Sequence, residues 1–167
     1  LLLTVEPPPA HTVTIAQPKG GKIIIEPDGT EFEEGTIVRL TAEPAEGYEF
    51  VNWTGSIDST EDTLVLPIDK PMEVGAQMQD IAPPLITITS PTPGPVIDQV
   101  LNIMGSVTDN DQLVSYEWYR GDKLEGSLNP DASGNFTING LELKEGKNPF
   151  KITAKDASGN EAIEEFV

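Results

Sequence analysis

The sequence predicts an all-β protein made of two small modules in tandem. Gly and Pro contribute 15 residues each to the 167-residue chain, and they separate about a dozen short segments rich in β-branched residues. Several segments alternate apolar and polar residues, and no stretch has the period of an amphipathic helix. A chain of this length accommodates two modules of about 70 to 85 residues, each with a usable core.

A proline-rich segment comes before the first module. Residues 1–5 have the composition of a strand, and Glu6-Pro7-Pro8-Pro9 follows them. Three consecutive prolines cannot donate the hydrogen bonds of a sheet interior, so this segment is predicted to be a stiff, extended linker. We therefore expect residues 1–9 to be a linker or the tail of a preceding module.

The first module is predicted to span residues 10–80 as about six short strands. Gly-containing turns separate them, because Gly reaches the positive φ that tight turns need. Tyr48 and Phe50 are expected on one face of their strand, with Val51 and Trp53 on the other. The expected strands are Thr12–Ile15, Lys22–Glu26, Thr36–Ala42, Tyr48–Trp53, Thr63–Ile68 and Met72–Met78.

A second acidic and proline-containing segment, residues 80–84, predicts the boundary with the second module, which spans residues 84–167. Trp118 is expected in its core, because it lies two residues from Tyr116 in an alternating central strand. The expected strands are Leu85–Thr89, Val100–Val107, Leu113–Arg120, Gly134–Leu141, Asn148–Ala154 and Glu161–Val167, with a further short one at Lys123–Leu128.

Three stretches of the first module have a distinctive order. They are Gly20-Gly21-Lys22-Ile23, Phe32-Glu33-Glu34-Gly35-Thr36, and residues 40–55 with their Gly-Tyr-x-Phe-x-x-Trp core. Together with the closing Met-x-Val strand, they resemble the divergent internalin-type B repeat of bacterial surface proteins over residues 11–79. Ala76-Gln77-Met78 departs from the Asn-Phe pair on which that family more often ends.

The second module resembles a bacterial immunoglobulin-like domain, which implies a β-sandwich. The segments that match are Ile86–Pro91, Ile103–Asp109, Glu117–Tyr119, Gly134–Phe136, Glu145–Asn148 and Ala154–Asn160. Both resemblances imply extracellular, cell-surface or secreted multidomain proteins of bacteria, in which such modules act as spacers or adhesive units. Neither family is known for catalysis, and neither resemblance names a ligand.

Composition excludes several classes of function. The formal net charge of −18 repels nucleic acid and anionic membranes, and no apolar run reaches the length of a membrane span. The charge favours solubility, and it also leaves open an affinity for divalent cations. The absence of Cys excludes disulfides and cysteine-bound zinc, which fits an exported bacterial protein.

Catalytic motifs are not found in the sequence. There is no Cys nucleophile, and the only His is His11, beside the proline linker, where a solvated strand end is expected. The stretch from Gly140 to Lys147 has the wrong spacing for a phosphate-binding loop, and Asn148 stands where Ser or Thr is required. The chain is therefore predicted to be a non-enzyme that needs no cofactor.

A repeated pentapeptide is the most specific motif. Asp131-Ala132-Ser133-Gly134-Asn135 recurs as Asp156-Ala157-Ser158-Gly159-Asn160, which is typical of turns in which Asp accepts backbone amides. With the strand at Lys123–Leu128, the loops holding these motifs and Asp109-Asn110-Asp111 meet at one pole of a sandwich. The candidate calcium ligands are therefore Asp109, Asp111, Asp131 and Asp156, with turn formation and solubility as the simpler alternative.

Two functions are consistent with these observations. The first is a spacer or adhesive module pair of a bacterial cell-surface or secreted multidomain protein, with an unknown protein or polysaccharide ligand and further flanking domains. The second is a carbohydrate-binding accessory part of a secreted polysaccharide-degrading enzyme, which requires exposed, coplanar aromatic rings.

Overall fold

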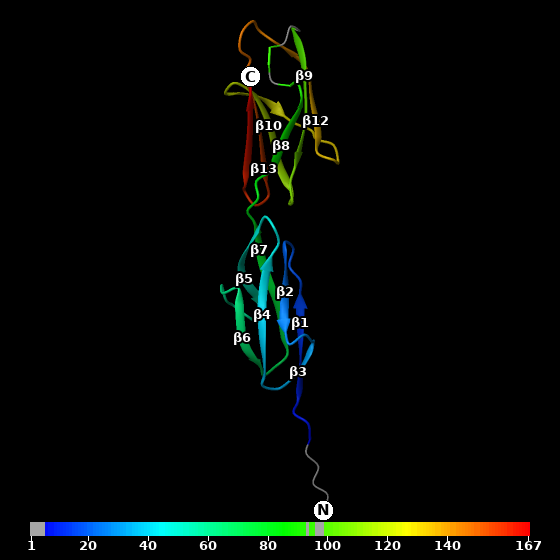
Figure 1. Cartoon of the computed structure of the whole chain (residues 1–167), viewed down its shortest axis with the longest axis vertical. Coiled ribbons are helices and arrows are strands. Elements are labelled where there is room, and N and C mark those ends of the chain that lie inside the picture. Colours follow the sequence, from blue (N-terminus) through cyan, green and yellow to red (C-terminus); the bar gives the residue numbers. More distant parts are fainter. Residues whose placement is uncertain (1–5, 93, 96–98) are drawn as a thin grey trace, which may run out of the picture. The chain divides into compact units, whose positions relative to one another are not determined.

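The computed structural model describes residues 6–92, 94–95 and 99–167, and within them every regular element is a strand. The all-β prediction is confirmed. The chain divides into two compact units, the first ending at Asp80 and the second beginning at Ile81. Figure 1 shows strands β1 to β7 (blue to green) in the first unit and β8 to β14 (green to red) in the second. The strand expected at residues 1–5 lies outside the described residues.

The first unit consists of two sheets. One has the order β3-β1-β7-β5 and the other β2-β4-β6, and β1 and β7 are the only parallel pair among the described strands of this unit. The six expected strands are present, and Glu31–Glu33 adds a seventh whose Phe32 is buried between two exposed glutamates. The strands are β1 (Ala10–Ala16), β2 (Gly21–Glu26), β3 (Glu31–Glu33), β4 (Thr36–Pro44), β5 (Tyr48–Gly55), β6 (Thr63–Ile68) and β7 (Met72–Asp80).

The core of this unit lies between its two sheets, which both contribute side chains to one apolar cluster. In β4 the inward-facing residues Val38, Leu40 and Ala42 are buried, whereas Ile37, on the opposite face of the strand, is exposed. This period of two is the reason why the alternating sequence forms a strand with one buried face. Trp53 is the largest fully buried side chain, and its indole Nε1–H donates to the carbonyl oxygen of Glu61 at 2.7 Å.

A bulge in β5 makes the expected assignment of its faces wrong. Phe50 pairs with Met78 and Asn52 with Gln77, so Val51 is an extra residue in the strand. A bulge shifts all following side chains by one position, because the side-chain period of a strand is two. Phe50 and Trp53 therefore lie on the same face, with their ring centroids 5.6 Å apart in an edge-to-face arrangement.

The second unit is a sandwich of a three-stranded and a four-stranded sheet, with the orders β12-β9-β8 and β11-β10-β13-β14. All its pairings are antiparallel. This is the seven-stranded arrangement expected of an immunoglobulin-like domain. The strands are β8 (Leu85–Ser90), β9 (Val100–Thr108), β10 (Leu113–Arg120), β11 (Lys123–Ser127), β12 (Asn135–Glu142), β13 (Phe150–Asp156) and β14 (Glu161–Phe166).

Trp118 packs against the core of the second unit, but it is only partly buried. Its strand β10 is central, as expected, and Trp118 pairs with Ile152 on one side and Gly126 on the other. A Cβ at Gly126 would lie 3.3 Å from Nε1 of Trp118, so the ring extends toward β11. Because β11 is an edge strand, no further strand covers that side of the ring.

The two Trp residues are expected to contribute unequally to stability. Trp53→Ala should lower the free energy of unfolding of the first unit by about 3 to 5 kcal/mol, because it empties a fully buried site. Trp118→Ala should cost less in the second unit, since part of its ring is already exposed. Urea unfolding of the whole chain, followed by circular dichroism, measures both values, and equal losses would contradict this difference in burial.

Candidate functional site

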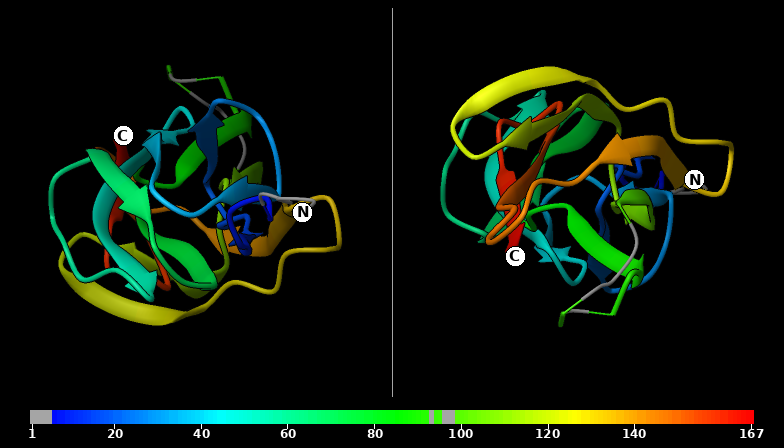
Figure 2. Two further views of the ribbon diagram at one scale, coloured as in Figure 1. Left: turned by 90° about the horizontal axis from the view of Figure 1, so that it is seen from below. Right: turned by 90° about the horizontal axis from the view of Figure 1, so that it is seen from above.

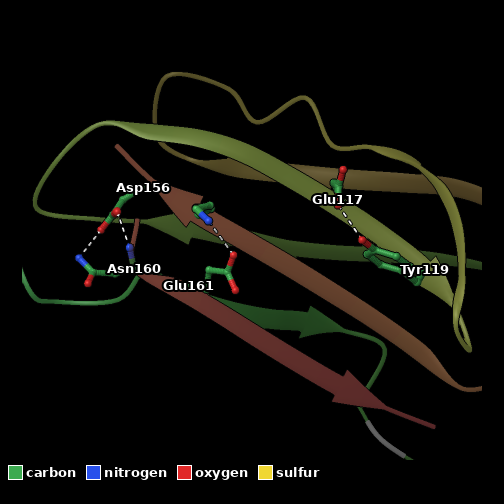
Figure 3. A network of polar contacts seen from close by, with 6 residues as sticks. Glu117, Tyr119, Asp156, Asn160 and Glu161 are labelled. Atoms are coloured by element: carbon green, nitrogen blue, oxygen red, sulfur yellow. Dashed lines mark hydrogen bonds and ion pairs between the residues drawn. The ribbon is translucent and has the colours of Figure 1, made fainter. Parts of the chain in front are cut away.

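The two copies of the repeated pentapeptide form the same hydrogen-bonded loop. In the first copy Asp131 accepts the backbone N–H of Asn135 through Oδ1 at 3.0 Å and its side-chain amide through Oδ2 at 3.2 Å. In the second copy Asp156 accepts the same two groups of Asn160, both at 2.8 Å. Figure 3 shows Asn160 turned back toward Asp156. The Asn at position five of the motif is thus as important to the loop as the aspartate. The sequence pattern alone did not indicate this role of Asn, although both copies contain it.

The two loops differ in burial. Asp156 is 1% exposed, whereas Asp131 is exposed. Asp131 belongs to the connection between β11 and β12, a segment drawn in gold in Figure 2. The hydrogen bonds from the backbone and side chain of Asn135, together with the backbone N–H of Ser133, hold the pKa of Asp131 below its usual value. These bonds favour the charged carboxylate, so the loop is organised around a negative charge.

Asp109 and Asp111 also stabilise a turn. Oδ1 of Asp109 accepts the backbone N–H of Asp111 at 2.8 Å, and Oδ1 of Asp111 accepts that of Gln112 at 2.7 Å. Each of the four candidate aspartates therefore has at least one oxygen engaged with a nearby backbone amide. This is the local chemistry that explains Asp in turns without any ligand.

Strand pairing places the loops that hold these aspartates at one end of the second unit. Leu113 at the start of β10 pairs with Asp156 at the end of β13, and Asn135 at the start of β12 pairs with Ser106 near the end of β9. Asp109, Asp111 and Asp131 line one open pocket of about 380 Å³. Carboxylate oxygens of Asp109 and Asp156 lie within 4.8 Å of one another, but Asp111 and Asp131 belong to no such close group of ligands among the described residues.

Tyr119 is a half-buried candidate for a sugar-stacking ring, and charged side chains lie beside it. Its hydroxyl donates to Oε2 of Glu117 at 2.6 Å (Figure 3). On the ring face, Nζ of Lys151 lies 4.3 Å from the ring centroid. The hydrogen bond to Glu117, then burial and the negative charge of Glu117, raise the pKa of Tyr119, while a hydrogen bond with Thr153 lowers it. With one face against an ammonium group, this ring resembles a cation–π pair within a sheet more than a binding platform.

His11 lies at a strand end, as expected, but it is half-buried rather than solvated. It lies within β1, its side chain is 18% exposed, and its Nε2 is 3.9 Å from Oε2 of Glu34.

The fold and these loops define a class of protein, namely an all-β chain of two independently packed modules whose polar loops are organised by turn chemistry. Residues 11–81 match the family model described as Divergent InlB B-repeat domain, and residues 84–163 match the one described as Bacterial Ig domain. The predicted resemblances are confirmed. Modules of these two kinds are typically non-catalytic and belong to surface or extracellular proteins. A search of the curated proteins gives no match.

Within the described part of the chain, no helix has the length and apolar character of a membrane-spanning segment.

The matched glycines of the two pentapeptides give a direct test of the loop geometry. Both have positive φ, +81° for Gly134 and +96° for Gly159. A Cβ at Gly134 would lie 2.2 Å from the carbonyl oxygen of Val107, whereas one at Gly159 would meet nothing within 4 Å. We expect Gly159→Ala to destabilise the second unit by about 1 to 2 kcal/mol through its backbone conformation alone. Gly134→Ala should destabilise it more, and urea unfolding that ranks the two the other way round would refute the assigned geometry.

Proposed function

We propose that this chain is a non-catalytic spacer or adhesive module pair of a bacterial cell-surface or secreted multidomain protein. The observation on which this depends is the structure of the polar loops: the aspartates that most resemble a functional site accept hydrogen bonds from their own turns. Each unit also completes its own apolar core. A module that only has to persist and separate its neighbours needs nothing more.

The charge of the chain supports an extracellular role. A net charge of −18 keeps a module soluble at high local concentration, and it repels nucleic acid and anionic membrane surfaces. The absence of Cys makes both units independent of the redox state of their surroundings. The partners of such a pair are the flanking domains of a longer chain and a protein or polysaccharide ligand.

A replacement experiment tests the spacer role. In the full-length protein, residues 10–167 are exchanged for two unrelated β-sandwich modules of similar length, and surface display and binding of the parent protein are compared. Retention of both properties supports a spacer. Loss of binding with normal display would instead assign a ligand to these modules, and titration with soluble oligosaccharides would then separate a sugar from a protein ligand.

Carbohydrate binding is the weaker alternative. Sugar platforms need exposed aromatic faces, but Trp53 is buried, Trp118 packs against the core and Tyr119 lies beneath Lys151. A lysine and a glutamate around one tyrosine leave little apolar surface on which a sugar ring can stack.

We propose calcium binding at the aspartate pole as a separate property, because one distance favours it. Two oxygens bound to the same Ca²⁺ at about 2.3 to 2.6 Å lie at most about 5 Å apart. The Asp109 and Asp156 carboxylates, within 4.8 Å of one another, satisfy this limit. Asp111 and Asp131 line the adjoining pocket. Their negative charges add to the attraction for Ca²⁺ without a direct bond to the ion.

Calcium is therefore expected to raise the melting temperature of the second unit relative to chelator. A tenfold excess over the dissociation constant stabilises the native state by about 1.4 kcal/mol. Asp109→Asn should abolish the shift and keep the turn, since the amide oxygen still accepts the Asp111 N–H. The matched control is Asp122→Asn in the exposed turn between β10 and β11, which should retain the shift. The absence of any shift in the unmodified protein would leave these aspartates as turn formers.

A further inference from the structure

Strand β12 contains a bulge at the only Asn-Gly pair of the sequence. Ile138 pairs with Ile103 and Leu141 with Leu101, so Asn139 and Gly140 together stand opposite Asn102 alone. β12 is an edge strand of its sheet, and Asn139, Gly140 and Asn102 are exposed. A bulge removes residues from the regular ladder, so the backbone of this pair is not held by a neighbouring strand.

A side chain replaces the missing ladder bond. The backbone N–H of Gly140 donates to Oδ1 of Asn102 at 2.9 Å. Gly140 has φ +67°, in the region that favours glycine, and a Cβ built there would meet nothing within 4 Å. Gly140 is thus required by its backbone conformation and not by packing. The two neighbours of the pair, Ile138 and Leu141, are buried and fix both ends of the bulge.

We propose that Asn139 is a site of spontaneous deamidation and that Asn102 is the residue that slows it. The backbone nitrogen of Gly140 attacks Cγ of Asn139, and a five-membered succinimide ring forms as the Cγ–Nδ2 bond breaks. Ammonia leaves with the proton that the Gly140 nitrogen loses. Water then opens the ring at either carbonyl, which gives an aspartyl or an isoaspartyl residue at position 139. Glycine offers the least steric hindrance to the attack because it has no Cβ.

The hydrogen bond to Asn102 opposes this reaction in two ways. The Gly140 nitrogen must lose its proton to become a nucleophile, and donation to Oδ1 stabilises the protonated amide. The same bond also fixes the orientation of the Asn139–Gly140 peptide, which must rotate to bring nitrogen and Cγ together. Conversion adds a negative charge to the exposed edge, and the isoaspartyl product also lengthens the backbone of the bulge. The extent of conversion at position 139 therefore increases with the age of the folded chain.

The experiment compares acceptor-free and acceptor-retaining variants of the whole chain. The unmodified protein, Asn102→Leu, Asn102→Ala and Asn102→Asp are incubated at mildly alkaline pH, and peptide mapping by mass spectrometry measures conversion at position 139. Loss of one net hydrogen bond should accelerate conversion roughly three- to tenfold in the Leu and Ala variants. Asn102→Asp should stay near the rate of the unmodified protein, because its carboxylate still accepts the Gly140 N–H.

Two controls separate this mechanism from general loosening. Melting temperatures show whether each variant is folded, which is expected because Asn102 is exposed. The unmodified protein in urea gives the rate without the hydrogen bond, which should exceed the native rate. The proposal is overturned if the folded Leu and Ala variants convert no faster than the unmodified protein. It is equally overturned if other asparagines convert before Asn139.

Discussion

Burial between paired sheets is the interaction on which both units depend. The chain contains no Cys, so no disulfide limits the unfolded state, and units of about 80 residues bury only a moderate fraction of their surface. Each unit compensates with one continuous apolar cluster to which both of its sheets contribute. The largest buried groups include Trp53 of edge strand β5 and Ile152 of central strand β13.

Small sheets leave many edges, and the chain blocks several of them with side chains. The amide of Gln17 accepts the backbone N–H of Ile23 at 2.8 Å and donates to its carbonyl oxygen at 3.1 Å, so it occupies the edge of β2 as a strand would. Pro67 lies in edge strand β6, and the bulge at Gly140 interrupts edge strand β12. Such features oppose the pairing of one sheet edge with another chain.

The acidic loops likewise use side chains to satisfy backbone hydrogen-bonding groups. A turn between strands needs its backbone amides satisfied, and an aspartate followed by Gly and Asn does this within five residues. Repeated use of this solution at one end of the second unit concentrates negative charge there. In Asp131 and Asp156 both carboxylate oxygens accept loop hydrogen bonds. The proposed cation binding is compatible with this structural role, because a carboxylate has more lone pairs than these bonds occupy.

The sequence by itself determined most of the strand segments, although not the short strand Glu31–Glu33, and it also predicted the division into two modules and the turns formed by the two pentapeptides. These features depend on local properties, namely the alternation of apolar residues, the φ of Gly and the reach of Asp and Asn side chains. Only the tertiary structure decided the bulge at Val51, the partial exposure of Trp118 and the contrast between buried Asp156 and exposed Asp131. Each of these depends on which strand lies alongside, and neighbours distant in sequence leave no trace in the local pattern.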